Sequence, residues 1–373
     1  MKTSVVLVAA GKGERLGLGV PKAEARIGQQ SLYQHSLATL LSFNPAQLIV
    51  VAPRDLVSQY ESIAEEFGFE SCLVVAGGET RQDSVSNGLA LVSHDRVLVH
   101  DAARAFMPAA VFQRVEAALE HFDCVIPVLK ISDTLKSIAQ DVVTGTVDRG
   151  TTVKSQTPQG FKTAILRSAL QSTKDNFTDE AALLESQGYQ VGTVNGSELG
   201  LKVTTPEDLD WARLRFGDAR TGIGTDAHRF SAEGTLVLGC LEWPDYPALE
   251  GHSDGDSVAH AIVDALLGAA GLGDIGSNFG VDRPEYSGAS GEVFISGALE
   301  LVTQAGFEVV NVSVQVIADK PKIGPRRAEL EKRLSELVGA KVSVLATTTD
   351  GLGFLSDARG VAAVATALLR ERS

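Results

Sequence analysis

Short apolar runs rich in β-branched residues alternate with longer helix-like stretches along the first 128 residues. The runs lie at Ser4–Ala9, Leu48–Ala52, Cys72–Ala76, Arg96–His100 and Cys124–Val128. The helix-like stretches lie near residues 31–42, 54–67, 82–92 and 108–121. Strands that alternate with helices form βαβ units, whose strands pair in parallel. We therefore predict an α/β fold with a mostly parallel sheet for this part of the chain.

The rest of the chain predicts a second α/β unit. A length of 373 residues corresponds to about two domains. A short helix is expected at Pro206–Phe216, followed by a polar break at residues 217–220. Beyond the break, strands are expected near 221–229, 235–239, 308–318 and 341–347, and helices near 255–270, 291–305, 325–338 and 359–371. The predicted organisation is a domain over residues 1–216, a short linker at 217–220 and a domain over 221–373.

The charge argues against a surface for nucleic acid or anionic membrane. The chain has a formal net charge of −14, and residues 1–221 and 222–373 are each acidic. No apolar run reaches the roughly 18 to 20 residues that span a membrane. The first residues lead straight into a strand-like run, without the apolar core of a secretory leader. We expect a cytoplasmic protein.

The cysteines do not suggest a disulfide framework or a cysteine zinc site. Cys72, Cys124 and Cys240 are odd in number, far apart and outside any C-x-x-C pattern. We expect three buried thiols.

A glycine-rich loop follows the first predicted strand. Residues 10–22 read AGKGERLGLGVPK, with Gly11 and Gly13 at its start. Small residues let backbone N–H groups approach an anion, and this end of a parallel strand is where α/β sheets bind ligands. The spacing fits neither the dinucleotide fingerprint nor the P-loop. The same glycines could form a turn that binds no ligand. Arg15 and Lys22 in the same loop, however, add two cations that could neutralise a triphosphate.

Six further motifs follow in order over most of residues 1–216. They are GGETRQDSV at 77–85, HDAAR at 100–104, DTLK at 133–136, TVDR at 146–149, QTPQ at 156–159 and KVTTPED at 202–208. With the loop, they resemble the 2-C-methyl-D-erythritol 4-phosphate cytidylyltransferase family. The resemblance implies a Rossmann-like nucleotidyltransferase domain. It also implies transfer of CMP from CTP to methylerythritol phosphate, release of pyrophosphate, and magnesium on the CTP phosphates.

The resemblance assigns residues to the parts of that reaction. The cytosine and ribose side would be held by Gly78, Arg81 and Ser84. The triphosphate and its transition state would be held by Arg15, Lys22 and Lys202. The methylerythritol phosphate would be held by Asp101, Arg104, Thr134, Arg149 and Thr178. Such a reaction needs positioning and charge neutralisation, because the acceptor phosphate is already the nucleophile.

Individually, these residues have simpler explanations. Asp101 could cap a helix at a strand end, and Thr178 is also a candidate N-cap before Asp179 and Glu180. Arg81, Arg149 and Lys202 could each be surface cations. It is the ordered set of motifs that favours the active-site interpretation. The family usually has a proline where Ala105 follows HDAAR, and we expect only a less rigid loop from that difference.

The second half offers a set of three possible metal ligands. Asp226 and His228 are two residues apart on a predicted strand, so their side chains share a face. Asp256, His260 and Asp264 recur every four residues on a predicted helix. Three N/O ligands with an open fourth position are typical of catalytic zinc. A histidine such as His260 more often only packs within its helix, so the pattern alone leaves this open.

Motifs from about residue 221 to the end favour a metal site over simple packing of His260. They are GTDAHRF at 224–230, HSDGDSVAHA at 252–261, DALLGAA at 264–270, LGDIG at 272–276, ADKPK at 318–322 and ATTTDGLGF at 346–354. They resemble the 2-C-methyl-D-erythritol 2,4-cyclodiphosphate synthase family. The resemblance implies that the substrate's 2-phosphate attacks its own β-phosphorus and expels CMP. It also implies magnesium on the diphosphate and a ring of three chains with sites between them.

The resemblance again implies residue roles. Zinc, or another divalent metal, would be held by Asp226, His228 and His260. The remaining substrate contacts would be His252 and Ser253 at the phosphates, Asp264, Asp274 and Gly276 at the ribose and methylerythritol pocket, and Lys322, Thr347 and Thr348 toward the cytidine diphosphate end. Phe354 would be a further substrate contact.

Two stretches depart from the second family. Its F-P-D reads Phe279-Gly280-Val281 here, followed by Asp282, so a carboxylate contact there is in doubt. Its G-R-G-E-G reads as residues 356–360, with Asp357 and Arg359 exchanged in sign. In the family that arginine lies near the threefold channel. We hypothesise that this protein binds a terpenoid diphosphate in the channel more weakly than its relatives do. If the protein and its Asp357→Arg variant bind a prenyl diphosphate equally tightly, the hypothesis is wrong.

The two resemblances together indicate a bifunctional enzyme of isoprenoid precursor synthesis, a nucleotidyltransferase and a phosphorus–oxygen lyase. Its reactions are not consecutive, because a kinase must act between them on the cytidylylated intermediate. A homo-oligomer is expected: a trimer of cyclase domains, extended to a hexamer if the cytidylyltransferase domains pair. That kinase is also a possible partner.

Two rivals stay open from the sequence: a nucleotidyltransferase for another polyol phosphate, and a nucleotide-sensing scaffold with a structural metal. The glycine spacing disfavours a Rossmann oxidoreductase.

Overall fold

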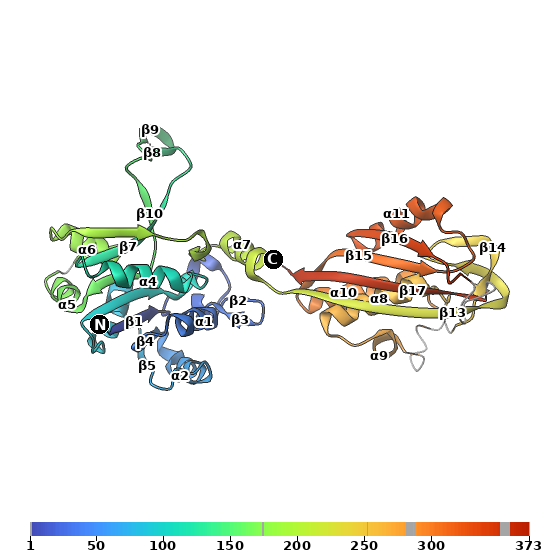
Figure 1. The fold of residues 1–373 in the computed structure, drawn as a ribbon, viewed down its shortest axis with the longest axis horizontal. Helices are drawn as coiled ribbons and strands as arrows, with labels where there is room; N and C mark the ends of the chain where they lie inside the picture. Colours follow the sequence, from blue (N-terminus) through green and yellow to red (C-terminus); the bar gives the residue numbers. More distant parts are fainter. Residues whose placement is uncertain are drawn as a thin grey trace. The chain divides into compact units, whose positions relative to one another are not determined.

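The computed structural model describes residues 2–173, 175–251, 253–280, 286, 288–350 and 359–372. The chain divides into two compact units, Met1–Ala212 and Arg213–Ser373 (Figure 1). Helix α7 (Pro206–Phe216) ends just before the polar break predicted at 217–220, and strand β13 (Ala219–Val237) begins within it. In the described part of the chain, no helix is long and apolar enough to cross a bilayer.

The sheet of the first unit has a parallel centre. Its strands run in the order β10-β7-β11-β6-β1-β4-β5, with β12 paired to β7. Strand β1 lies between β6 and β4 and is parallel to both, and β11 and β10 pair antiparallel with their neighbours. The bounds are β1 Thr3–Val8, β4 Gln47–Ala52, β5 Leu73–Ala76, β6 Arg96–Asp101, β7 Cys124–Lys130, β10 Val153–Ser155, β11 Gln159–Lys162 and β12 Val191–Asn195. The predicted α/β class with a mostly parallel sheet is confirmed.

Helices cover both faces of this sheet. Along β1, Val5 and Leu7 pack into one apolar cluster with α1, α2 and α4, and Val6 packs into another with α3, α5 and α6. A strand that is buried on both faces consists almost entirely of apolar residues, and this is why β1 can be recognised in the sequence. The bounds are α1 Leu32–Phe43, α2 Val57–Glu66, α3 Arg81–Ala90, α4 Ala109–Ala118, α5 Thr163–Gln171 and α6 Glu180–Ser186.

Two small hairpins complete the first unit. Strands β2 (Arg26–Ile27) and β3 (Gln30–Ser31) form one of them. Strands β8 (Leu135–Ala139) and β9 (Val142–Val147) form the other, which projects away from the sheet (Figure 1). Ile138, Val142 and Val143 on this hairpin are exposed, an unusual place for three β-branched apolar side chains.

The second unit is a five-stranded sheet in the order β14-β13-β17-β15-β16. Strand β13 covers the strand predicted near 221–229 and continues without interruption into the one predicted near 235–239, where it ends at Val237. One apolar cluster joins the sheet to α8, α10 and α11. The bounds are β14 Glu242–Leu249, β15 Phe307–Ile317, β16 Lys341–Thr347, β17 Gly360–Glu371, α8 Ser257–Ala270, α9 Ile275–Phe279, α10 Gly291–Gln304 and α11 Arg327–Val338.

The helix predicted at 359–371 is wrong, because these residues form strand β17. The segment is rich in alanine and leucine, which favour helix. It nevertheless lies between β13 and β15 and pairs antiparallel with both. Val361, Ala363 and Ala365 alternate inward as in a strand. Pairing on both sides of the segment outweighs a weak intrinsic preference.

The cysteines differ in part from the prediction of three buried thiols. All three are free, but only Cys124 is fully buried, and Cys72 and Cys240 are partly exposed. Burial raises the pKa of Cys72 to about 12, so this thiol stays protonated at neutral pH.

Candidate active sites

The glycine-rich loop folds back on itself directly after β1. The Lys22 backbone N–H donates to the Gly11 carbonyl at 3.0 Å, closing the loop. Gly13 has a φ of +73°, and a Cβ there would lie 3.0 Å from the Lys22 backbone nitrogen. Glycine thus allows both the left-handed backbone and the close crossing. The fold-back brings Lys22 beside Gly11, which precedes it by 11 residues.

A cavity of about 460 Å³ lies over this loop. It brings together residues that the sequence predicted from four separate motifs. The predicted residues lining it are Gly11, Gly13, Arg15, Lys22, Gly78, Arg81, Ser84, Asp101 and Lys202. The nucleotide-side and triphosphate-side predictions therefore converge on one place in the fold.

Asp101 is the centre of charge in this cavity. Its Oδ2 accepts a hydrogen bond from Lys202 Nζ at 2.7 Å, and its Oδ1 accepts from Arg81 Nε at 3.1 Å. Burial would raise the pKa of Asp101, but the charges of Arg81 and Lys202 hold it well below its usual range. Asp101 is therefore ionised at neutral pH, and it does not cap a helix with its side chain.

Lys22 is a cation with an unusually low pKa. Its Nζ donates to Thr204 Oγ1 at 3.2 Å. Burial and the neighbouring charges of Lys202 and Arg15 lower the pKa of Lys22 to about 8, against the opposing pull of Asp101 and Asp208. A bound polyanion would offset that repulsion between cations.

We expect the affinity for CTP with magnesium to fall as pH rises above about 8, because Lys22 loses its charge there. Binding that requires one proton weakens by about ten-fold per pH unit beyond the pKa of the free protein. Isothermal titration calorimetry from about pH 6.5 to about pH 9.5 measures this affinity. Lys22→Arg keeps its charge over this range and should show a flatter profile. The same slope in both proteins would exclude Lys22 as the titrating group.

The start of α3 shapes the side of the cavity that Gly78, Arg81 and Ser84 line. The helix begins at Arg81 with a capping box between Thr80 and Asp83. Ser84 Oγ accepts a hydrogen bond from the Gly78 backbone N–H at 3.1 Å. A Cβ on Gly78 would lie 2.2 Å from the Asp83 Cβ, so only glycine allows the backbone to turn this tightly.

Four of the predicted acceptor-binding residues do not line the cavity. Arg104 donates to backbone carbonyls instead, to Gly200 at 2.8 Å and to Ser155 at 3.3 Å. Thr134 and Arg149 are exposed next to the β8–β9 hairpin, where Arg149 donates to the Ser132 carbonyl. Thr178 is exposed and is not the helix cap, because Asp179 caps α6 by accepting from the Ala182 N–H at 2.9 Å.

Sequence reasoning missed several polar residues around the cavity. Glu180 is buried against Arg81, and Gln156 holds the segment before Lys202 by donating to the Ser197 carbonyl at 2.9 Å. Thr157 Oγ1 accepts from the Asp101 N–H at 3.1 Å. Gln156 and Thr157 belong to the QTPQ motif, which was recognised without any role. Their side chains contact protein groups, which periodicity and motif spacing do not reveal.

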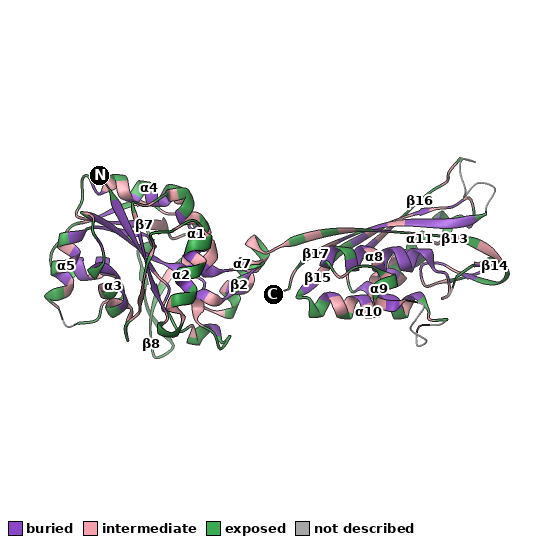
Figure 2. Cartoon of the chain, turned by 90° about the horizontal axis from the view of Figure 1, so that it is seen from below, coloured by how far each residue is buried: buried purple, intermediate pink, exposed green. Residues whose placement is uncertain are grey.

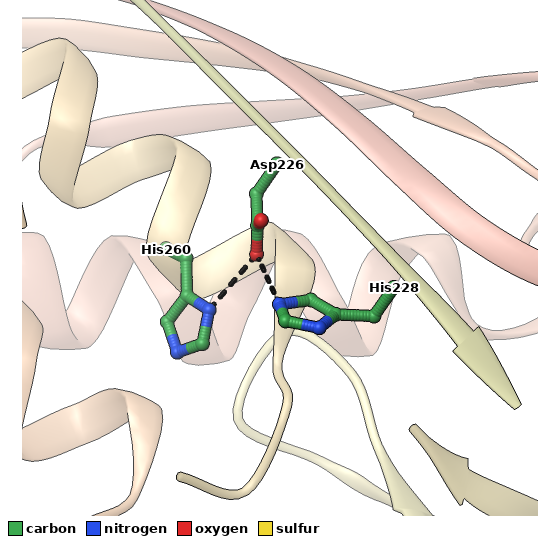
Figure 3. A group of neighbouring side chains, drawn as sticks. All are labelled: Asp226, His228 and His260. Atoms are coloured by element: carbon green, nitrogen blue, oxygen red, sulfur yellow. Dashed lines mark hydrogen bonds and ion pairs between the residues drawn. The ribbon is translucent and has the colours of Figure 1, made fainter. Parts of the chain in front are cut away.

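Asp226, His228 and His260 meet in the second unit (Figure 3). Asp226 Oδ2 lies 2.8 Å from His228 Nε2 and 2.9 Å from His260 Nδ1. One potential ligand atom from each residue lies within 4.8 Å of the others. Small side-chain shifts would place all three on one ion at the usual bond lengths of about 2.0–2.2 Å. The donor set fits a divalent metal ion.

Neighbouring groups orient this triad. His228 Nδ1 donates to the Glu250 carbonyl at 2.6 Å, which leaves Nε2 facing Asp226. His260 Nε2 lies 3.1 Å from Ser253 Oγ. Burial would raise the pKa of Asp226, but hydrogen bonds from His228 and His260 hold it well below its usual range. The carboxylate is therefore ready to act as an anionic ligand.

Close packing of α8 on β13 brings the triad together. Figure 2 shows α8 as an almost wholly buried helix. Gly222 and Gly224 lie two residues apart on the same face of β13 as Asp226, and a Cβ on either would lie 2.1 Å from a carbonyl oxygen of α8. The missing side chains let the helix backbone approach the strand, so His260 reaches Asp226.

The other predicted cyclase residues differ in their burial and in their hydrogen-bond partners. Asp264 is half-buried on α8 and accepts from the Ile275 N–H at 2.7 Å, and burial raises its pKa. Asp274 caps α9, the short helix that contains Gly276. Lys322 and Thr347 are exposed, and Thr348 Oγ1 donates to Asp350 at 2.8 Å. His252, Phe354, Asp282 and Asp357 lie outside the described residues.

Asp256 is a structural residue rather than a metal ligand in the described structure. It is the N-cap of α8, and its carboxylate accepts from the backbone N–H groups of Gly239, Cys240, Val258 and Ala259. Asp256 and His260 are four residues apart, but they have different roles: Asp256 caps the helix and His260 belongs to the triad.

Comparisons with known proteins identify a family for each of the two units. Residues 3–217 match the family IspD, 2-C-methyl-D-erythritol 4-phosphate cytidylyltransferase, and residues 219–370 match the YgbB family. The chain is 47% identical to the bifunctional enzyme IspD/IspF of Clavibacter michiganensis, covering 99% of this chain and 94% of that one. The corresponding protein of Rhodospirillum rubrum is 38% identical, with 99% and 98% covered. The solved structure of the bifunctional IspDF from Campylobacter jejuni aligns with a TM-score of 0.50 at 28% identity, covering 100% of this chain and 99% of that one.

Proposed function

The chain belongs to the family of bifunctional IspD/IspF enzymes, and on that premise we propose how its residues divide the work of two reactions. The first reaction transfers CMP from CTP to 2-C-methyl-D-erythritol 4-phosphate and releases pyrophosphate. The second cyclises 4-CDP-2-C-methyl-D-erythritol 2-phosphate to the 2,4-cyclodiphosphate and releases CMP. The observation that carries the proposal is that each unit holds one site, and that each site's charges suit one reaction.

The cytidylyltransferase reaction belongs to the cavity over the glycine-rich loop. Arg15, Lys22 and Lys202 neutralise the triphosphate and the charge that develops at its α-phosphorus. The Gly78 turn, Arg81 and Ser84 hold the nucleoside. Asp101 positions the acceptor, whose phosphate attacks without help from a general base, since it is already anionic. Magnesium on the CTP phosphates would supply further charge neutralisation.

The cyclase reaction belongs to the triad site. Zinc, or another divalent ion, held by Asp226, His228 and His260 would act as a Lewis acid on a phosphate oxygen. Ser253, which contacts His260, would hold a phosphate, together with His252. Asp264, Asp274 and Gly276 would line the sugar pocket, and Lys322, Thr347, Thr348 and Phe354 would hold the cytidine diphosphate end. A magnesium ion would accompany that diphosphate.

A homo-oligomer would complete both sites. In the cyclase unit, the helices α8, α10 and α11 share one apolar cluster with one face of the sheet, and Ile223 and Leu345 are exposed apolar side chains on its strands. These exposed residues support a trimer of this unit. In the first unit, Thr134 and Arg149 do not line their own cavity and flank the exposed apolar hairpin. They would serve the acceptor in a neighbouring chain if the hairpins mediate pairing, which extends the trimer to a hexamer.

Val142→Lys should therefore reduce the assembly from hexamer to trimer and lower cytidylyltransferase activity, because it places a charge on the apolar hairpin. Light scattering coupled to size-exclusion chromatography gives the mass, and cyclase activity should not change. Thr144→Lys adds the same charge at an exposed polar position of the same strand and is the control. An unchanged mass for Val142→Lys would contradict hairpin pairing.

We also propose that the intervening kinase docks on this enzyme and that both act in the cytoplasm. A kinase must phosphorylate the product of the first site before the second site can use it. Docking of that kinase on this protein would shorten the path of the intermediate between the two active sites. The first reaction consumes CTP and a polyol phosphate, and the second consumes a CDP-linked polyol phosphate; the use of these phosphorylated metabolites supports the cytoplasm as the place of action.

Phosphorus NMR tests the two reactions directly. The protein is incubated with methylerythritol phosphate, CTP and magnesium, and then with the separate kinase and ATP. Pyrophosphate and a cytidylyl diester should form first, followed by CMP and a cyclic diphosphate. If ribitol phosphate competes as well as methylerythritol phosphate, the acceptor assignment is wrong. If neither stage produces a change, the proposed reactions are wrong.

A further inference from the structure

Glu180 is a buried acidic side chain at the start of α6, beside the cytidylyltransferase cavity. Only 3% of its surface is exposed. Its Oε1 and Oε2 accept from Arg81 Nη1 at 2.7 and 2.9 Å. Both oxygens act as acceptors, as expected of the ionised carboxylate. A buried charge is costly unless it is paired, and here the partner is a residue that lines the cavity.

Arg81 connects Glu180 to Asp101. Its Nη1 faces Glu180, and its Nε and Nη2 both lie 3.1 Å from Asp101 Oδ1. The other oxygen of Asp101 accepts from Lys202 at 2.7 Å. Two carboxylates thus determine the orientation of the guanidinium plane. The guanidinium in turn sets which oxygen of Asp101 is left for Lys202.

Gln159 fixes the start of α6, and thereby the position of Glu180. It is 1% exposed and lies on β11, opposite Val99 of the strand that ends in Asp101. Its Nε2 donates to Asp179 Oδ2 at 2.8 Å, and its Oε1 accepts from the Ala181 N–H at 3.2 Å. One side chain therefore holds the residues on both sides of Glu180.

We propose that Glu180 is a positioning residue for the cytidylyltransferase reaction, acting through Arg81 on Asp101, with Gln159 holding it in place. The inference deepens the proposed function of this cavity and rests on it. Glu180 does not contact the substrates in this proposal. It keeps the guanidinium and the Asp101 carboxylate in the arrangement that receives them, so no reorganisation is needed when they bind.

The test is a double-mutant cycle on the full chain. Glu180→Gln keeps the shape of the side chain and removes its charge, and kcat/KM for CTP should fall roughly ten-fold through loss of the charged hydrogen bonds. In an Arg81→Gln background, the same change should cost less than about two-fold, because residues that act through one another are not additive. Cyclase activity of the same preparation measures the amount of intact chain. Glu185→Gln, an exposed charge change on the same helix, should match the wild type.

Two further measurements keep the proposal falsifiable. If Glu180→Gln does not fold, the cycle is run with Gln159→Met, which keeps the Glu180 carboxylate in the chain but removes the hydrogen bonds that hold the start of α6. Additive losses in either cycle, or wild-type kcat/KM in both single variants, would overturn the proposal. Calorimetric binding of CTP with magnesium is measured in parallel: Glu180→Gln should weaken it in the wild-type background and should not weaken it further in the Arg81→Gln background. That readout decides the role of Glu180 even if the acceptor is not methylerythritol phosphate.

Discussion

An Asp226→Asn variant should lose cyclase activity by at least about 100-fold while its cytidylyltransferase activity stays at the wild-type level. Loss of groups that merely orient metal ligands already costs about 10- to 100-fold, and in the proposed metal site Asp226 would itself be a ligand. Its Oδ2 lies within 2.9 Å of both imidazoles, so it is the atom on which the site converges. An amide is nearly the same size but carries no charge to attract a cation.

Metal analysis by mass spectrometry and the two activities are measured on one preparation. Bound divalent metal per chain should fall together with cyclase activity. Asp245→Asn removes an exposed carboxylate from β14 of the same unit and should change neither. A variant that keeps its metal and its cyclase activity would mean that the triad is a set of hydrogen bonds and not a metal site. A variant whose second unit unfolds would indicate a structural metal.

A Gly224→Ala variant should destabilise the second unit by about 3 kcal/mol or more, at or beyond the upper end of ordinary overpacking. The added Cβ would lie 2.1 Å from the Ala261 carbonyl oxygen and 2.5 Å from the Ala265 backbone nitrogen. Backbone atoms of a buried helix cannot rotate away, so α8 must move off β13. His260 moves with α8, and we expect cyclase activity and metal binding to fall with stability.

Differential scanning calorimetry of the full chain follows the transition of the second unit. Gly268→Ala is the matched control, since Gly268 lies on α8 and the nearest atom outside its own helix turn to an added Cβ would be the Ile223 carbonyl oxygen at 3.9 Å. It replaces glycine within a helix and should be neutral or stabilising by up to about 1 kcal/mol. Equal melting temperatures for Gly224→Ala and the wild type would show that the close approach of α8 is not required.

Several features of the fold were accessible from local patterns. The buried parallel strands appear as short β-branched runs, and the glycine-rich loop follows the first of them. The spacing of Asp226 and His228 places both on one face of a strand, and both belong to the observed triad. These predictions succeed because they depend on alternation and turn chemistry within a few residues. Strand β17 was mistaken for a helix because its alanines have no local pattern that excludes one.

The partners of buried polar groups were not accessible from local patterns. Asp179 caps α6 rather than Thr178, and Glu180 faces Arg81, which precedes it by 99 residues. Four predicted acceptor residues lie outside the cavity of their own chain, although their motifs were recognised. A motif identifies the residue but does not say which surface its side chain will face.

The amino-acid sequence alone therefore predicts the two α/β units, the glycine-rich loop after the first strand and the three metal-ligand candidates. The tertiary structure decides how distant segments approach one another. His260 meets Asp226 only because two glycines let α8 lie close to β13. Asp101 becomes the centre of the first cavity only because α3, α6 and the segment at Lys202 bring their charges to one strand end. Both depend on packing across the sheet, where steric contact and electrostatic pairing are set by three-dimensional distance and not by spacing along the chain.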